Sequence, residues 1–395
     1  MMATSTKRGN SYKITSSCRY DISGKQIRQH MTWTPRPGMT ERQIEKELDR
    51  QKKLFDEQVK NDQTRNGNIR FQHFAEQYLR EYVQLRLKAK TAWDYQQKLE
   101  RINRAIGHIK LKDLKPAHIN SFYAILQEDG MHTQSGEKLS QRTVHAYHRV
   151  LSAALSKAVK WEYISENPAK RAAPPPLGKP KTTYLDEPDA RRLLELLHNE
   201  PIRWRTMITF DLLSGLRRGE LLGLRWCDID AESQTIVINQ TSNYVPGRGV
   251  YIDTPKNDTS NRPLHLTKSV FILLEEYKAW QDNQRDICGD AWRDKDGRVF
   301  TAEDGAPVFP DSITQWFSKF VKRVGLPKVT VHSLRHTYAS LMIAEDVSLV
   351  VVSNQLGHAN PSTTANIYAH AIASAKAKAA QTLDKFADVV EGHSS

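Results

Sequence analysis

Hydrophobic and polar residues follow a two-residue period near the start of the chain and a helical period over much of the remainder. Residues 11–35 alternate, which predicts short strands, with Ser23-Gly24-Lys25 as the turn between the first two. Thr40 then offers an N-cap for a helix expected to end near Val59. Residues 1–62 are therefore predicted to form a small α+β domain, a short sheet with one helix.

Within residues 67–172 the hydrophobic period is helical from Ile69 to about Trp161, in four segments that begin near Phe71, Thr91, Lys115 and Ser140. Thr91 and Ser140 are the predicted N-caps of the second and fourth helices. The leucine and aromatic spacings are those of a packed core. We expect an all-α domain here.

A proline-rich run covers residues 173–183 and predicts an extended, semi-rigid linker. The next helix is expected to begin after Asp186 as its cap, with Pro188 in its first turn. Farther on, two strands are predicted on either side of the polar turn 257–260, as one hairpin with Lys256 near its tip. Residues 184–395 are thus expected to form a mixed, mainly α domain with a small antiparallel sheet.

Charge separates the front of the chain from the back. The net charge is +13, and residues 1–62 hold 13 Lys/Arg and 8 Asp/Glu, residues 67–175 hold 18 and 10, and the remaining residues are close to neutral. This distribution predicts forward domains that grip a polyanion such as a DNA backbone. On the predicted sheet and helices the candidate DNA-binding residues are Lys13, Arg19, Lys25, Arg28, Lys90, Arg142 and Arg149. Tyr12 and Trp33 stand among the first of these, and a solvated sheet face explains the same pattern equally well.

The three cysteines, Cys18, Cys227 and Cys288, are far apart and predict neither a disulfide framework nor a zinc ribbon. The sequence contains no apolar run of about 18 residues, the least that a membrane helix needs. We therefore expect a cytoplasmic protein with no membrane partner.

The stretch His332-Ser-Leu-Arg335-His336 puts two imidazoles and a guanidinium on one helical face. Two histidines four apart are typical of zinc helices, but Ser333 stands where such a helix carries its glutamate base. The permanent charge of Arg335 favours an anion such as phosphate over a divalent cation. From this helix alone, phosphate binding, ordinary helix packing and a metal site all stay open.

Three other pieces of the last domain carry groups suited to a phosphodiester. Gly215 is expected to end one helix and Arg217 to open the next, with Glu220 placed to hold a guanidinium. Lys256 has the reach to release a proton into a groove. His358 and, ten residues later, Tyr368 complete the set.

In these residues the chain resembles the tyrosine recombinases, also called phage-type integrases, and among them the integrases of conjugative transposons. That family combines an arginine in a T/S-G-L-R-x-x-E context, a hairpin lysine, H-x-x-R, L-G-H and a closing tyrosine. All five occur here in that order, as Arg217 with Glu220, Lys256, His332 with Arg335, His358, and Tyr368. The spacing of ten between the last two departs from the commoner nine, and Tyr338 is the nearby competitor for the role of nucleophile.

The resemblance implies a site-specific recombinase that integrates and excises a mobile element without ATP, cofactor or metal. Tyr368 would attack a DNA phosphate to form a 3′-phosphotyrosine, with Arg217 and Arg335 on the non-bridging oxygens and Lys256 as general acid. His332 would be the base and His358 a donor, although these two roles can be exchanged.

The resemblance also implies the remaining organisation: an arm-site DNA-binding domain, a helical core-site-binding domain and a catalytic domain. It implies a tetramer on double-stranded DNA with exchange of C-terminal tails, an accessory excision factor, and action at a bacterial nucleoid. Two alternatives stay open: a non-catalytic DNA-binding protein with this fold, and a metal-dependent nuclease that uses His332 and His336.

Overall fold

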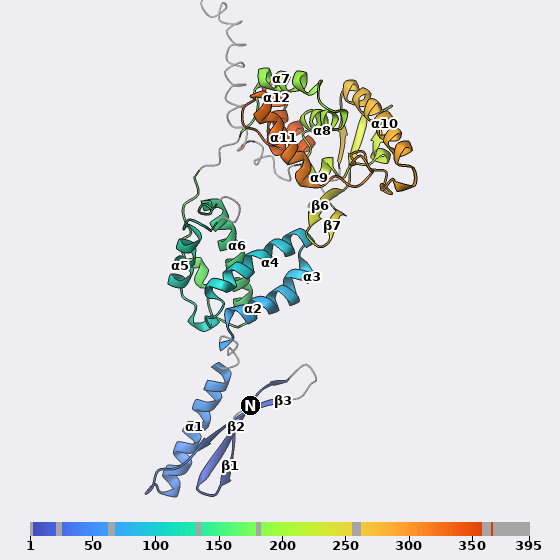
Figure 1. Cartoon of the computed structure of the whole chain (residues 1–395). Coiled ribbons are helices and arrows are strands. Elements are labelled where there is room, and N and C mark those ends of the chain that lie inside the picture. Colours follow the sequence, from blue (N-terminus) through green and yellow to red (C-terminus); the bar gives the residue numbers. More distant parts are fainter. Residues whose placement is uncertain are drawn as a thin grey trace, which may run out of the picture. The chain divides into compact units, whose positions relative to one another are not determined.

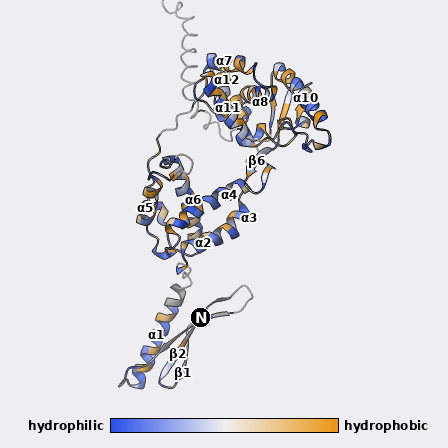
Figure 2. Ribbon diagram, viewed as in Figure 1, coloured by the Kyte–Doolittle hydropathy of each residue, from blue (hydrophilic) through white to orange (hydrophobic). Residues whose placement is uncertain are grey.

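The computed structural model describes residues 3–20, 26–61, 68–131, 136–178, 183–254, 262–357 and 365. The chain divides into two compact units, residues 1–178 and 179–395 (Figure 1). The finer division of the first unit at residues 62 and 67 stays a prediction. Along the helices of both units, hydrophilic and hydrophobic residues alternate on the ribbon (Figure 2), as amphipathic packing requires.

The first unit begins with a three-stranded antiparallel sheet in the order β1-β2-β3, followed by helix α1. Their bounds are β1 Thr4–Arg8, β2 Ser11–Tyr20, β3 Gln26–Trp33 and α1 Glu41–Asn61. Strand β1 was not predicted, because its five residues are mostly exposed and lack a hydrophobic alternation. Ile14, Leu48 and Phe55 form the small core between sheet and helix.

The register of this sheet corrects the prediction for Tyr12 and Trp33. Side chains alternate between the faces of a strand, and Tyr12 pairs with Trp33 while Lys13 pairs with Thr32. Tyr12 and Trp33 therefore lie on the face that packs against α1, with their rings 5.8 Å apart. Lys13 lies on the opposite face.

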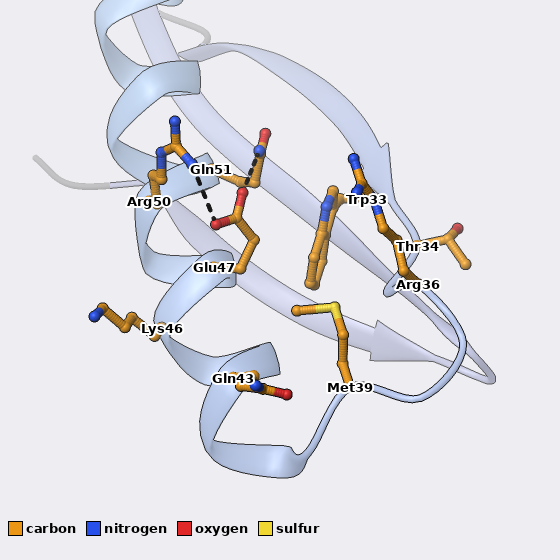
Figure 3. Close-up of a pocket in the computed structure, with 9 residues that line it drawn as sticks. All are labelled: Trp33, Thr34, Arg36, Met39, Gln43, Lys46, Glu47, Arg50 and Gln51. Atoms are coloured by element: carbon orange, nitrogen blue, oxygen red, sulfur yellow. Dashed lines mark hydrogen bonds and ion pairs between the residues drawn. The ribbon is translucent and has the colours of Figure 1, made fainter.

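A groove of about 710 Å³ opens between the end of β3, the loop after it and α1 (Figure 3). Trp33 and Met39 supply its apolar part, and Arg36 and Lys46 lie at its rim. Glu47 in the same groove accepts a 3.0 Å hydrogen bond from Gln51.

The remaining described part of the first unit is helical, and its apolar faces enclose one core. Its helices are α2 Phe71–Tyr78, a π-helical turn Leu79–Val83, α3 Gln84–Arg86, α4 Ala89–Ile106, α5 Pro116–Leu126 and α6 Gln141–Lys160, with 3₁₀ turns at Leu111–Asp113 and Pro168–Arg171. The Ser140 hydroxyl accepts from the Thr143 amide and caps α6, as predicted. The prediction for Thr91 is wrong, because α4 begins earlier and Lys88 is its N-cap residue.

The second unit combines seven α-helices with two small antiparallel sheets among its described residues. The helices are α7 Glu187–Leu197, α8 Ile202–Ser214, α9 Arg218–Leu221, α10 Lys268–Cys288, α11 Pro310–Val324, α12 Val331–Ala344 and α13 Leu349–Leu356, with 3₁₀ turns at Trp226–Asp228 and Gly289–Ala291. The strands are β4 Ile229–Asp230, β5 Thr235–Ile238, β6 Thr241–Val245, β7 Gly249–Asp253 and β8 Arg262–His265. Asp186 caps α7 through the Asp189 amide, as predicted.

The core of the second unit surrounds α8, which packs against α12 and α10 (Figure 1). Most of the α8 sequence is apolar, and Met207, Ile208 and Phe210 are fully buried. This central helix ends at Gly215, which has a left-handed backbone with φ of 61°. The chain therefore turns at the predicted place, two residues before Arg217.

The two strands that flank residues 255–261 do not pair with each other, so the predicted hairpin is wrong. β7 pairs with β6, and β8 pairs with β5 in the other sheet. A tight turn at Val245–Gly249 joins β6 to β7, and β8 places Leu264 beside the buried Ile236. Lys256 follows β7 and precedes β8 in the sequence, and it falls outside the described residues.

Among the residues that the structure describes, no helix combines the length and the hydrophobicity needed to cross a bilayer. In the same part of the chain, no three His, Cys, Asp or Glu side chains gather as a metal-binding group.

Candidate active site

The turn after α8 holds Arg217 by a carboxylate three residues on, as the sequence predicted. The Arg217 Nη1 donates to Glu220 Oε1 at 2.7 Å, and the Arg217 amide donates to Glu220 Oε2 at 3.1 Å. Glu220 is only 2% exposed, whereas the Arg217 side chain is 39% exposed. The carboxylate is thus a buried anchor for a guanidinium that reaches solvent.

Helix α12 carries His332 and Arg335 on one side, and the structure brings Arg335 to the Arg217 turn. The Arg335 Nη1 donates to the Gly215 carbonyl at 2.8 Å, and its Nη2 donates to the Leu356 carbonyl at 2.5 Å. Arg335 is 2% exposed. This helix starts at a capping box in which Thr330 and Ser333 exchange hydrogen bonds.

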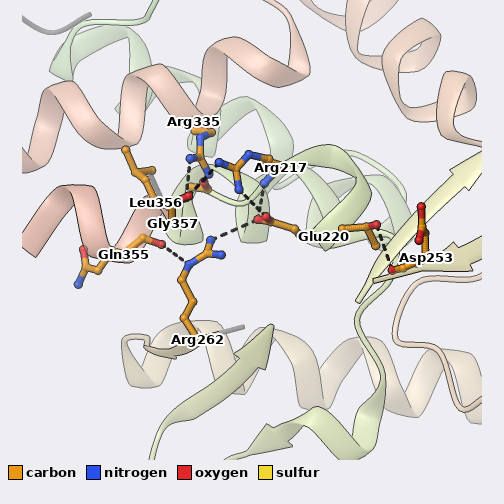
Figure 4. Close-up of polar contacts among 10 residues, drawn as sticks. Arg217, Glu220, Asp253, Arg262, Arg335, Gln355, Leu356 and Gly357 are labelled. Carbon is orange, nitrogen blue, oxygen red and sulfur yellow. Dashed lines mark hydrogen bonds and ion pairs between the residues drawn. The ribbon is translucent and has the colours of Figure 1, made fainter. Parts of the chain in front are cut away.

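Three arginines converge on the C-terminal end of α13 (Figure 4). Their donors reach three successive carbonyls: Arg262 Nε to Gln355 at 2.7 Å, Arg335 Nη2 to Leu356 at 2.5 Å, and Arg217 Nη2 to Gly357 at 3.1 Å. The last carbonyls of a helix lack intrahelical partners and carry partial negative charge, so cations are favoured there. The cluster ends directly before His358.

Glu220 is shared by two of these arginines. Arg262 Nη2 lies 3.2 Å from Glu220 Oε2, opposite the oxygen that accepts from the Arg217 side chain. Burial acts to raise the pKa of Glu220, but Arg262 and Arg217 outweigh it and hold that pKa below its usual value. Glu220 is therefore an anion at neutral pH, and the cluster keeps an excess of positive charge.

Asp211 lies beneath this cluster, one turn before Gly215. It is fully buried, and neither carboxyl oxygen has a hydrogen-bond partner among the described residues. Burial raises the pKa of Asp211 well above its usual value; Arg335 opposes that rise and Glu220 adds to it. The prediction from sequence missed Asp211, because a single acid in an apolar helix has no local signal.

His332 is exposed at the start of α12, and its ring lies 4.9 Å from that of His336. Desolvation by the surrounding protein lowers the pKa of His332, and the charges of Arg335 and Arg217 lower it further. The imidazole is therefore neutral, and able to accept a proton, at neutral pH. Tyr338 points elsewhere: its hydroxyl donates to Gln355 Oε1 at 2.6 Å.

The structure describes only part of the predicted site. Arg217, Glu220, His332 and Arg335 lie together, whereas Lys256, His358 and Tyr368 are outside the described residues. Arg262 was missed by the prediction from sequence, because its partners are distant in the chain.

The predicted DNA-binding side chains are distributed over the first unit. Lys13 is half-buried and Arg28 exposed on the same face of the sheet. Arg142 and Arg149 are exposed on α6, two turns apart, and the Lys90 ammonium lies 4.5 Å from the centre of the Trp93 ring. Lys25 and the Arg19 side chain are outside what the structure describes. Contact of these residues with DNA stays a prediction.

Comparison with known proteins identifies the family of this chain. The phage integrase family model matches residues 183–374, which include all the predicted catalytic residues, and a phage integrase SAM-like domain model matches residues 70–173. The chain belongs to the phage integrase family. It is a tyrosine recombinase with the multidomain, mainly helical fold that the sequence predicted.

Several relatives of this recombinase match over most of its length. A tyrosine recombinase XerC-like protein of Caldanaerobacter subterraneus is 28% identical over 94% of this chain and 95% of the relative. The ICEBs1 integrase of Bacillus subtilis is 26% identical over 73% of this chain and 77% of its own. Among solved structures, the Tn1549 transposon integrase in complex with transposon right-end DNA has a TM-score of 0.65, with 21% identity over 80% of this chain and 99% of that chain.

The fold match extends to a more distant recombinase. A lambda integrase dimer bound to a core site has a TM-score of 0.54, with 15% identity over 92% of this chain and 94% of that chain. At these identities the two structural matches concern the fold.

Proposed function

We propose that this tyrosine recombinase integrates and excises a mobile element of the conjugative-transposon type through a 3′-phosphotyrosine intermediate. The observation that carries the proposal is the meeting of Arg217 and Arg335 at the end of α13, directly before His358. This brings together residues from three motifs that are far apart in the chain. A phosphodiester is the ligand that two fixed guanidiniums and a neutral imidazole suit best.

In the proposed first step, the Tyr368 oxygen forms a bond to the scissile phosphorus and the bond to the 5′-oxygen breaks. His332 accepts the phenol proton, and Lys256 donates a proton to the departing 5′-oxygen. His358 donates to a phosphate oxygen. In the second step the 5′-hydroxyl of another strand attacks the phosphotyrosine, so that one phosphoester replaces another and no ATP is consumed.

The arginines act where negative charge grows in the transition state. Ionising a tyrosine of pKa about 10 at pH 7 costs roughly 4 kcal/mol at about 1.4 kcal/mol per unit. Arg217, with its exposed head, is assigned to a non-bridging oxygen. Arg335 contributes charge from a buried position, where the effective dielectric constant is low and its effect on the same oxygens is larger than in water.

Structures of related integrases support a complex of several copies of this chain with DNA. The known structures include integrase complexes with transposon end DNA and a lambda integrase tetramer on a Holliday junction. We therefore propose double-stranded DNA as the partner and a homo-oligomer, a tetramer with exchanged C-terminal tails, as the active form. An accessory excision factor, and action at the nucleoid in the bacterial cytoplasm, complete the proposal.

The test is to trap the covalent intermediate. A duplex that carries the element's own end, nicked so that the short fragment with the 5′-hydroxyl diffuses away, is incubated with the protein in EDTA. We expect a protein–DNA band that survives denaturation. DNA bound without such a band would favour a non-catalytic DNA-binding protein. Cleavage only with an added divalent metal, leaving unattached DNA ends, would favour a nuclease.

His332 gives a prediction on pH dependence. Its pKa is lowered, so the neutral base persists below the ordinary histidine value of about 6.5. The rate of covalent complex formation should stay constant as pH falls to about 6.5 and decline only below it. In His332→Gln this decline should vanish, with a rate lower by about 10²-fold at neutral pH.

The measurement is the single-turnover rate at saturating DNA between about pH 5 and pH 8. Folding linkage has the same sign: because the unfolded chain binds the proton more tightly, the stability from neutral His332 is present above about 6.5 and is lost as pH falls through the lowered pKa. Far-ultraviolet circular dichroism at each pH separates the two effects. A rate that rises as the histidine protonates would instead make His332 the donor.

A further inference from the structure

Arg262 is the first residue of β8 and follows the segment that contains Lys256. It is 7% exposed, although a guanidinium is strongly polar. Burial of such a group is stable only where hydrogen bonds and opposite charge compensate its loss of hydration. The contacts of Arg262 therefore indicate what this position does.

Two of those contacts connect Arg262 to the residues that hold Arg217 in place. Arg262 Nη2 pairs with Glu220 Oε2, and Glu220 Oε1 accepts from Arg217. Arg262 Nε donates to the Gln355 carbonyl, two residues before the carbonyl that accepts from Arg217. The planar fork of one guanidinium thus joins the Arg217 turn to the α13 end (Figure 4).

The backbone approaches the guanidinium closely at Gly357. A Cβ added to that residue would lie 2.7 Å from Arg262 Nη1, and its φ is 63°. Only glycine fits both requirements without displacement of its neighbour. The backbone at Gly357, directly before His358, therefore packs against the Arg262 guanidinium.

We propose that Arg262 is a positioning residue for DNA cleavage. Its ion pair with Glu220 fixes the position of that carboxylate, and through it the position of Arg217. Its hydrogen bond to the Gln355 carbonyl fixes the end of α13, directly before His358, against β8. The inference rests on the proposed function. Arg262 is assigned no contact with DNA in this role, so its loss should slow chemistry while DNA binding is kept.

The experiment compares Arg262→Met and Arg262→Lys with wild type, using the nicked duplex in EDTA. Arg262→Met should lower the single-turnover rate of covalent complex formation at saturating DNA by about 10- to 100-fold, as small displacements of reacting groups do. The Kd for the same duplex should change less than about threefold. Arg262→Lys restores the charge beside Glu220 but cannot fork to both partners, so its rate should fall between the two.

Arg298 provides the matched control. It is 4% exposed in the same unit and pairs with Asp296 at 2.9 Å, and it contacts neither Arg217 nor α13 in any described interaction. Whatever its effect on Tm, Arg298→Met should leave the rate per folded, DNA-bound molecule at the wild-type value. Tm and circular dichroism of each variant give the folded fraction.

Three outcomes decide the matter. A slow Arg262→Met with intact binding, partly rescued in Arg262→Lys, supports the positioning role. A wild-type rate for Arg262→Met, or a loss explained entirely by its unfolded fraction, overturns it; if Arg262→Met does not fold, a wild-type rate for Arg262→Lys does the same. Absence of a covalent complex with the wild type refutes the proposed function instead, and so is distinguishable.

Discussion

Tyr368→Phe is expected to abolish the covalent protein–DNA complex and all strand exchange while DNA binding stays within about twofold of wild type. The variant lacks only the phenolic oxygen, which is the atom that bonds to phosphorus in the proposed step. Without that oxygen the proposed step has no nucleophile, so the loss should be complete rather than partial. The measurement is the denaturation-resistant band on nicked duplex, with a gel-shift titration of the same DNA.

Tyr338→Phe is the matched control, because Tyr338 is the competing tyrosine on α12, the helix that carries His332 and Arg335. Its hydroxyl donates to Gln355 Oε1, its ring would meet a side chain at Gly215, and burial raises its pKa, all of which belong to packing. The control should form the covalent complex at a rate close to wild type and unfold at a slightly lower temperature. Loss of the band in Tyr338→Phe but not in Tyr368→Phe would move the nucleophile to α12.

The sequence allowed good prediction wherever the determining partners are near neighbours. The caps at Ser140 and Asp186, the helix end at Gly215 and the Arg217–Glu220 pair each depend on residues within four positions. The placement of His332 and Arg335 on one helix was predicted for the same reason, because they are only three residues apart. The prediction of Thr91 as an N-cap was wrong because the helix begins before it, and Lys88 has the extended backbone of an N-cap residue.

What the sequence could not predict depends on partners far along the chain. The hairpin around Lys256 was inferred from two adjacent strands, but each pairs with a strand earlier in the sequence. The face of the sheet on which Tyr12 or Lys13 lies depends on the register between β2 and β3, and the charge pattern alone does not reveal that register. Arg262 and Asp211 acquire their roles only when β8, α8 and α13 meet.

Arg335→Gln should produce the largest combined loss, of both stability and activity. The guanidinium is buried and donates to the Gly215 and Leu356 carbonyls, and a shorter amide cannot reach both. Each buried carbonyl left without a donor costs about 1–3 kcal/mol, so the free energy of unfolding should fall by roughly 2–6 kcal/mol. Loss of this preorganised positive charge near the reacting phosphate should slow cleavage by about 10²- to 10³-fold.

Arg217→Lys separates the loss of activity from the loss of stability. The Arg217 side chain is 39% exposed, so its replacement leaves few buried groups without a partner. We expect a similar loss of cleavage rate with a Tm close to wild type, since lysine keeps the charge beside Glu220 but lacks the second donor for Gly357. Urea unfolding and single-turnover cleavage of both variants provide the comparison. An Arg335→Gln protein as stable as wild type would contradict the structural account of the arginine cluster, and one that cleaves at the wild-type rate would remove Arg335 from the catalytic site.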